Sequence, residues 1–442
     1  MKWTDASSFL CLAHLAGACL LPEERAGGSI RRHNTRQIRN SGKAIGTGDR
    51  FNGGALFPIG LGSGNETDMS TILNVKEVNS ALQGLAKEYG FETFTTPYTT
   101  YEGATMSGGT VGGQGTCDET YRVFLNGAIH ARERGSSDNV LYFIADLLYA
   151  EKHGTGLTYG DKTYTNADVV TALSTGIVFL PLSNPDGVAY DQSTNSCWRK
   201  NRNPAAATNG DDDTVGVDLN RNFDFVWDLS KWATSVADEV ASEDPSSEVY
   251  HGEAAFSEPE TQSIKWVMDT YSKVRWFLDL HSYAGDILYS WGSDTDQSTN
   301  TAKNFLNSAY DSVRGKTSDS TTTGYGEYIS SADLDNVSSV GKRMGTAMDA
   351  ATGRSYTVMQ SAYLYPTSGA SDDYAFSRHF ADPDLNLAYG YTVEFGFGNN
   401  KASCPFYPTD AQYIQNLQET NAGFMEFLLG AAEVGLGDSQ AC

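Results

Sequence analysis

The sequence predicts an α/β protein in which helices cover both faces of a mixed β-sheet. Segments with helical spacing of apolar residues alternate along the chain with short, strongly apolar runs. Some of these runs are almost unbroken, as in residues 177–182, which is typical of strands buried on both faces. This alternation of helices and buried strands favours the α/β class. The chain has no internal repeat and no second hydrophobic unit after a linker, so we expect one large domain.

The first predicted elements begin after residue 70. Apolar residues at helical spacing predict a helix over residues 79–89, and the run 121–129 predicts a strand. A second helix is expected over residues 140–148, where apolar side chains recur at intervals of three and four. Ser136 or Ser137 is the expected N-cap of this helix, because a serine hydroxyl can accept from a free backbone N–H.

The later elements follow the same alternation. The apolar run 177–182 predicts a buried strand that ends in the turn Asn184-Pro185-Asp186-Gly187, residues 184–187. Residues 257–260 (Ser-Glu-Pro-Glu) predict a capping box that opens another helix. Two further strands are expected over residues 276–280 and 389–395.

Composition and charge exclude two classes of protein. The 442 residues are 40% hydrophobic and 12% aromatic, which is too much apolar material for an intrinsically disordered chain. The formal net charge of −24 argues against a nucleic-acid partner, because the chain has few cations to neutralise phosphates. The first 50 residues hold eight Lys or Arg and four Asp or Glu, a net charge of +4, so the rest carries −28.

The basic beginning of the chain predicts a separate leader. A short apolar run over residues 7–21 contains the small-x-small site Ala16-Gly17-Ala18, as in a signal peptide. We therefore expect a secreted protein, and no later run reaches the ~20 apolar residues of a membrane span. The expected divisions are a signal peptide (1–18), a basic Gly-rich leader or short pro-segment (19–67), a catalytic domain (68–433) and a C-terminal tail (434–442).

The cysteines fit an oxidising compartment. Two of the six lie in the leader, and the four that remain are Cys117, Cys197, Cys404 and Cys442. Four cysteines allow three pairings, or they can stay unpaired as buried thiols. We favour Cys117 with Cys197 and Cys404 with Cys442, since the second bond would fasten the tail.

Two strand ends carry residues that can bind a metal ion. His130 and Glu133 follow the strand 121–129, and His281 ends the strand 276–280. Two imidazoles and one carboxylate leave a fourth position open for water, which is the arrangement of a catalytic zinc site. His281 taken alone would more often be a hydrogen-bonded core histidine.

Six motifs together resemble the zinc carboxypeptidases of the carboxypeptidase A/B family. In chain order they are His130-Ala131-Arg132-Glu133, Asn184-Pro185-Asp186-Gly187, Trp198-Arg199-Lys200, Asp218-Leu219-Asn220-Arg221-Asn222, His281-Ser282-Tyr283 and Thr392-Val393-Glu394. The resemblance covers about residues 68–433. It implies an eight-stranded mixed sheet with helices on both faces. It also implies one Zn²⁺ per chain, held by His130, Glu133 and His281, the ligand set known from carboxypeptidase A.

The resemblance also implies roles for further site residues. Glu394 matches the general base that activates the attacking water, and Arg199 matches the arginine that polarises the scissile carbonyl. Asn220 and Arg221 match the pair that holds the terminal carboxylate of the substrate. The remaining implied substrate-binding residues are Arg132 at the subsite just upstream of the terminal residue, Tyr365 (or its neighbour Tyr363) as the closing tyrosine, Asp372 at the floor of the terminal pocket, and Ser282 and Tyr283.

These implications predict a secreted, monomeric zinc carboxypeptidase that acts on peptides and proteins with a free C-terminus. Asp372 favours basic (Lys or Arg) C-terminal residues, because a carboxylate in a closed pocket needs a cation. Arg378 or His379 could instead pair with Asp372, and the preference would then be apolar or aromatic. Two further hypotheses are a related zinc amide hydrolase and an inactive binding protein on the same scaffold. We expect no nucleic-acid partner and no membrane span.

Overall fold

The computed structural model describes residues 20, 21, 24, 42–64, 68–113, 118–207, 214–319 and 324–437. The expected signal peptide 1–18 lies outside these residues, as do residues 19, 22, 23, 25–41 and 65–67 of the expected leader. Within the described ranges, no helix combines the length and the apolar composition needed to cross a membrane.

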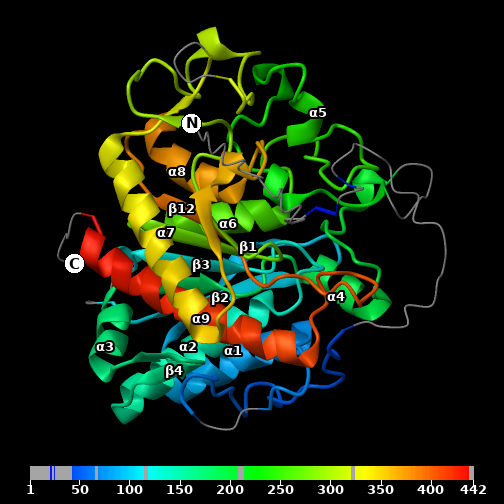
Figure 1. The fold of residues 1–442 in the computed structure, drawn as a ribbon. Helices are drawn as coiled ribbons and strands as arrows, with labels where there is room; N and C mark the ends of the chain where they lie inside the picture. Colours follow the sequence, from blue (N-terminus) through cyan, green and yellow to red (C-terminus); the bar gives the residue numbers. More distant parts are fainter. Residues whose placement is uncertain are drawn as a thin grey trace, which may run out of the picture.

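An eight-stranded mixed sheet forms the centre of the fold, which confirms the predicted class (Figure 1). From one edge to the other its strands are β1 (Glu92–Thr99), β2 (Thr105–Val111), β6 (Ile177–Leu180), β3 (Val123–Gly127), β7 (Trp276–His281), β12 (Tyr389–Glu394), β8 (Asp286–Tyr289) and β11 (Thr357–Gln360). The strands β6, β3, β7 and β12 run parallel to one another, and every residue in them is buried. Antiparallel pairs join β1 to β2, β2 to β6 and β12 to β8.

Helices surround this sheet. They are α1 (Val75–Tyr89), α2 (Ser136–His153), α3 (Asn166–Ser174), α4 (Pro185–Thr194), α5 (Ala237–Val240), α6 (Pro259–Thr270), α7 (Ser331–Thr352), α8 (Ser371–Ala381) and α9 (Asp410–Val434). Small two-stranded ribbons pair β4 (Leu157–Tyr159) with β5 (Lys162–Tyr164), and β9 (Asp296–Gln297) with β10 (Glu327–Tyr328). Helices α7 and α9 pack against each other, as Figure 1 shows.

Neighbouring residues of β12 show that helices lie on both faces of the sheet. The Tyr391 hydroxyl donates to the Val337 carbonyl of α7 at 2.8 Å. At Gly390, an added Cβ would lie 2.1 Å from the backbone oxygen of Asp372 in α8. Because successive residues of a strand point to opposite faces, α7 and α8 cover opposite sides. The close approach of α8 also explains why this strand carries a glycine.

The predicted helix caps differ from those observed. Helix α2 begins at Ser136 with Gly135 as its N-cap, and the Ser136 hydroxyl donates instead to the Leu280 carbonyl of β7. The capping box predicted at residues 257–260 is also wrong, although the helix it introduced exists as α6. Glu258 is the N-cap without a side-chain cap bond, because its carboxylate is taken by Asn201 and Asn203. In both places a tertiary contact replaces the local one.

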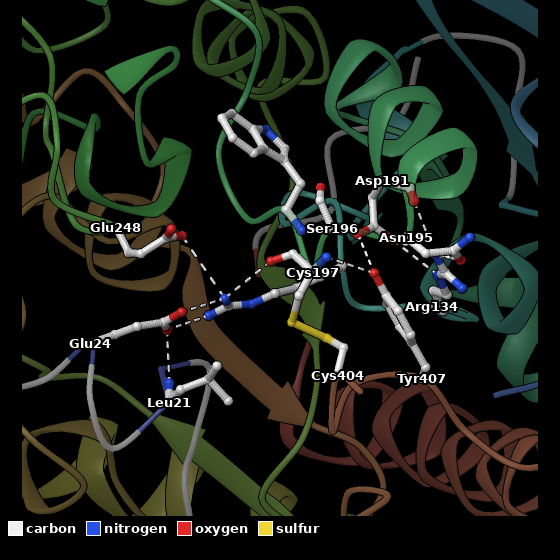
Figure 2. Close-up of a disulfide and its surroundings, with 12 residues drawn as sticks. Leu21, Glu24, Arg134, Asp191, Asn195, Ser196, Cys197, Glu248, Cys404 and Tyr407 are labelled. Carbon is white, nitrogen blue, oxygen red and sulfur yellow. Dashed lines mark hydrogen bonds and ion pairs between the residues drawn. A yellow bond between two sulfur atoms is a disulfide. The ribbon is translucent and has the colours of Figure 1, made fainter. Parts of the chain in front are cut away.

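The predicted disulfide pairing is wrong as well. Cys197 bonds to Cys404 across 207 residues of sequence, with a Cα–Cα distance of 5.5 Å (Figure 2). The loop after α4 therefore meets the loop before α9, and the Tyr407 hydroxyl accepts a hydrogen bond from the Cys197 backbone N–H. Cys117 and Cys442 lie outside the described residues.

Candidate metal centre and substrate pocket

Strand register brings the predicted metal ligands to one edge of the sheet. β3 and β7 pair in parallel with Gly127 opposite Leu280, and β7 pairs with β12 so that His281 lies opposite Glu394. The carboxyl ends of parallel strands meet at the same edge, and ligand sites of open α/β sheets lie there. The loop after β3 carries His130 and Glu133 to this edge.

His130, Glu133 and His281 form a compact group that can hold a metal ion. Their ligand atoms all lie within 4.8 Å of one another, and the three residues are buried. His130 Nδ1 is 2.8 Å from Glu133 Oε1 and 3.1 Å from His281 Nδ1, and His281 Nδ1 is 3.3 Å from Glu133 Oε2. Two imidazole nitrogens and one carboxylate that converge in this way fit a zinc ion.

Two buried aspartates orient the imidazoles. Asp218 Oδ1 lies 3.0 Å from His130 Nε2, and Asp279 Oδ2 lies 3.3 Å from His281 Nε2. Carboxylates at this position fix the ring orientation of metal-binding histidines. Burial raises the pKa of Asp279, but the charge of His281 and the hydrogen bonds from His281, Ser371 and Asn126 together outweigh burial and hold the pKa below its usual value. Burial also raises the pKa of Asp218. The charge of Arg199 is the largest of the interactions that together outweigh burial and hold this pKa far below its usual range.

Neither aspartate was among the site residues predicted from the sequence. Asp218 opens the motif that contains Asn220 and Arg221, and Asp279 is a charged residue within the apolar strand Trp276–His281. A buried charge is costly without partners, so this interruption was an available signal. Asn126 and Ser371 satisfy the Asp279 carboxylate at 2.8 and 2.6 Å.

Arg199 joins the metal group to the neighbouring pocket. Its Nε and Nη2 donate to Asp218 Oδ2 at 3.1 and 2.9 Å, while Nη1 lies 3.3 Å from His130 Nδ1. The Arg199 side chain is fully buried. These hydrogen bonds fix the plane of the Arg199 guanidinium and leave its Nη1 beside the metal group.

A cavity of about 390 Å³ adjoins the metal group, and six of the predicted residues line it. These are Arg199, Asn220, Arg221, Tyr365, Asp372 and Glu394. The apolar part of the wall comes from Leu288, Leu364 and Ala370. Tyr363, the neighbour of Tyr365, is not a lining residue and its exposed fraction is 62%. Arg132, Ser282 and Tyr283 lie outside this cavity.

Arg221 offers unused hydrogen-bond donors at the wall of this cavity. Its Nη1 donates to the Asn220 carbonyl at 2.7 Å, but its buried Nε and Nη2 have no hydrogen-bond partner in the described part of the chain. Asn220 is fixed beside it, because its side-chain oxygen accepts from the Ser371 N–H at 2.8 Å. Buried donors without partners are costly, so the cavity fits an anion that can accept from a guanidinium.

Glu394 lines the cavity and lies beside the metal group. It is the last residue of β12, its exposed fraction is 1%, and its register partner on β7 is the ligand His281. The site therefore combines a carboxylate, a metal-binding group and two arginines. Such a set can move a proton and stabilise developing negative charge.

Asp372 forms another part of the cavity wall. Its Oδ2 accepts from the Ser361 hydroxyl at 3.1 Å, and burial raises its pKa. Arg378 donates instead to Asp269 at 2.6 Å, and His379 contacts the Leu385 carbonyl. The predicted alternative, in which Arg378 or His379 pairs with Asp372, is therefore wrong. The Asp372 carboxyl faces the cavity, and α8 supplies no basic partner for it.

Ser282 and Tyr283 line a separate hollow of about 250 Å³, together with Phe397 and Phe406. Arg132 stacks on Phe406, with its Cζ 4.3 Å from the ring centroid. These residues therefore form a second region beside the metal group and are not part of the cavity that holds Arg221.

The chain is similar to known proteins over most of its length. The family model described as zinc carboxypeptidase matches residues 78–423. Carboxypeptidase A4 of Mus musculus is 27% identical over 275 residues, which are 62% of this chain and 50% of that protein. Carboxypeptidase B of Astacus astacus is 29% identical over 232 residues, or 52% of this chain and 67% of that protein. The chain spans about half the length of several of the curated relatives it matches.

Solved structures share the fold. Thrombin-activatable fibrinolysis inhibitor aligns with a TM-score of 0.59 at 20% identity, covering 82% of this chain and 75% of that one. Carboxypeptidase A of Helicoverpa armigera aligns with a TM-score of 0.57 at 22% identity, covering 83% and 75%. At these identities the likeness is one of fold.

Proposed function

This chain belongs to the zinc carboxypeptidase family, and from that premise we propose that it hydrolyses the C-terminal peptide bond of peptides and proteins. The observation that carries the proposal is the cavity beside the metal group, where Arg221 has two buried donors without a partner in the described residues. A free α-carboxylate is the anion that every peptide terminus provides. A zinc amide hydrolase of another kind does not require such a terminus, so Arg221 favours the exopeptidase.

The proposed chemistry divides between the metal and the chain. His130, Glu133 and His281 would hold one zinc ion, which when bound lowers the pKa of water and polarises a carbonyl. Glu394 accepts the proton of the attacking water and returns it to the leaving amine. Arg199, held by Asp218, donates to the carbonyl oxygen as negative charge develops on it.

The residues of the cavity wall bind the substrate. Arg221 and Asn220 bind the terminal carboxylate, and Tyr365 covers it, with its ring centroid 6.0 Å from the Arg221 Cζ. Arg132, Ser282 and Tyr283 contact the peptide upstream of its terminal residue. In this arrangement the scissile bond lies between Arg199 and Glu394.

Metal removal tests the enzyme class. We expect dialysis against a chelator to abolish the release of C-terminal residues from peptides, and one equivalent of Zn²⁺ per chain to restore it. Free amino acids and shortened peptides can be followed by mass spectrometry. An internal cleavage pattern, or full activity in the chelated protein, would contradict the proposal.

We also propose that basic C-terminal residues are accepted. Leu288, Leu364 and Ala370 can cover the methylene stem of an Arg or Lys side chain, and Asp372 can pair with its charge. The apolar wall also has room for aliphatic ends, so a dual preference fits the same cavity. The proposal further includes a catalytic domain over residues 68–433 and an enzyme that is monomeric and secreted. The Cys197–Cys404 disulfide supports secretion, because disulfides persist in oxidising compartments.

Asp372→Asn tests this preference on two otherwise identical peptides that end in Arg or Phe. We expect kcat/KM for the Arg peptide to fall by roughly 30- to 1000-fold, because an ion pair inside the cavity is lost. The Phe peptide should change little. Because burial raises the pKa of Asp372, the wild-type preference for Arg should weaken on acidification at a higher pH than an ordinary aspartate would give. An unchanged Arg-to-Phe ratio in the variant would contradict this role.

A further inference from the structure

Asp373 is a buried acidic residue that the proposed chemistry does not use. It follows Asp372 in the first turn of α8, its side chain is fully buried, and it does not line the substrate cavity. Both of its carboxyl oxygens lie 2.9 Å from the backbone nitrogen of Gly292, in the loop after β8. Burying a carboxyl group is costly unless it is hydrogen-bonded, so this single backbone N–H identifies what Asp373 holds.

Gly292 is the residue that permits this close approach. A Cβ at this position would lie 2.9 Å from Asp373 Oδ2 and 2.8 Å from Thr367 Oγ1, closer than real Cβ atoms come to other atoms. The Gly292 carbonyl accepts from the Thr367 N–H at 2.9 Å. Gly292 is therefore bonded to Asp373 through its N–H and to Thr367 through its carbonyl.

These contacts lead directly to the wall of the substrate cavity. Thr367 and Ser361 both line it, and Thr367 follows Tyr365 by two residues. A Cβ on Gly292 would lie 3.3 Å from the Cβ of Ser361, whose hydroxyl donates to Asp372 Oδ2 at 3.1 Å. A short chain of contacts thus runs from Asp373 through Gly292 to the loop of the closing tyrosine.

The Asp373 carboxyl can hold this loop without adding charge behind the pocket. Burial raises the pKa of Asp373 well above its usual value, and the charges of Asp372 and Glu327 raise it further, against the hydrogen bonds from Gly292 and Ser290. A neutral carboxyl still offers an oxygen to a backbone N–H. Asp372 then remains the carboxyl that faces the cavity.

We propose that Asp373 is a positioning residue for the terminal pocket: by its bond to Gly292 it fixes Thr367, and with Thr367 the loop that carries Tyr365. The Tyr365 ring is thereby kept beside Arg221 before substrate arrives, with its centroid 6.0 Å from the Arg221 Cζ. A loop that is ordered in advance costs less free energy to close on a ligand. This inference rests on the proposed carboxypeptidase function and adds a residue that acts on the substrate only through others.

Asp373→Ala and Asp373→Asn test the hydrogen bond. Alanine removes the acceptor, whereas asparagine keeps an oxygen for the Gly292 N–H and resembles a neutral carboxyl. We expect Asp373→Ala to raise KM by about tenfold for peptides that end in Arg or in Phe, while kcat per zinc-loaded chain falls by less than about threefold. Asp373→Asn should bring KM back to within about threefold of the wild type. An asparagine variant as impaired as the alanine variant, or a loss of kcat at unchanged KM, would overturn the positioning role.

Gly292→Ala tests the same link from its other end. The added methyl group does not fit between Thr367 and Asp373, so we expect a similar rise in KM although every carboxyl is kept. The matched controls are Ser377→Ala and Gly430→Ala. Ser377 is buried on the same helix but donates to a carbonyl of that helix, and a Cβ on Gly430 of α9 would meet no atom closer than 3.2 Å. Both controls should keep the wild-type KM, and an unchanged KM in Gly292→Ala would contradict the proposal.

Hydrogen exchange measured by mass spectrometry tests the positioning without any turnover. The Thr367 N–H is bonded to the Gly292 carbonyl, so we expect the peptide of residues 362–371 to exchange at least about tenfold faster in Asp373→Ala than in the wild type. Asp373→Asn and Ser377→Ala should show wild-type exchange in this peptide. Faster exchange in a protein that cleaves no substrate would refute the carboxypeptidase function alone, whereas unchanged exchange in Asp373→Ala would refute the positioning role.

Discussion

Replacing Glu394 with glutamine is expected to lower kcat by about 10⁴-fold while zinc and substrate still bind. Glutamine keeps the shape of the side chain but cannot accept a proton from the attacking water. General acid–base catalysis contributes about 10²- to 10⁴-fold, and the upper end applies here because one carboxylate serves both the attack and the departure of the amine. The fold should persist, since the strand register of β12 depends on backbone bonds.

Glu260→Gln is the matched control for this experiment. Glu260 is also fully buried, and burial raises its pKa to about 8, so it is largely protonated at neutral pH and resembles glutamine already. Zinc content by elemental analysis, KM and the melting temperature should match the wild type in both variants. Retention of more than about a tenth of wild-type kcat by Glu394→Gln would remove this residue from the role of general base.

Amidating the C-terminus of a good peptide substrate is expected to lower kcat/KM by about 10³-fold or more. The amide offers one acceptor and no charge to Arg221, whose Nε and Nη2 have no other hydrogen-bond partner in the described residues. A site built to bind a polar group rejects an analogue that leaves its buried donors unpaired. Steady-state kinetics on the free acid and the amide of one sequence measure this ratio directly.

Arg221→Gln should bring the acid-to-amide ratio close to one, chiefly by weakening cleavage of the free acid. Arg378→Gln serves as the control, because Arg378 is also a buried arginine but pairs with Asp269 of α6 and does not line the cavity. It should leave the ratio at its wild-type value. If the wild type cleaved the acid and the amide equally, an endopeptidase or another amidase would replace the carboxypeptidase assignment.

The fold class and the metal ligands could be predicted without a structure. Unbroken apolar runs such as residues 177–182 are recognisable because a strand buried on both faces needs apolar side chains at every position. His130, Glu133 and His281 could be found because each stands at or just beyond the end of such a run. In a parallel arrangement, strand ends meet at one edge of the sheet, so their positions along the chain already imply their meeting in space.

The resemblance to the family also predicted residues that line the cavity. Asn220, Arg221, Tyr365 and Asp372 come from segments far apart in the sequence, and their resemblance to one family implied a common cavity. The structure brings all four to one cavity wall. Whether Asp372 was paired inside the protein could not be inferred from the sequence, because Arg378 follows it closely on the same helix and points to Asp269 only once α6 is packed beside it.

Contacts between distant loops depend on the folded arrangement of the chain. The Cys197–Cys404 bond, the contact of the Asp218 carboxylate with His130 and the ion pair between Glu24 and Arg132 join groups that lie far apart in the sequence, and no local pattern predicts them. The predicted caps at Ser136 and Ser257 failed for the same reason, since those hydroxyls have partners on distant segments. Periodicity and capping patterns report energies within a few residues, whereas these bonds depend on which loops the sheet brings together.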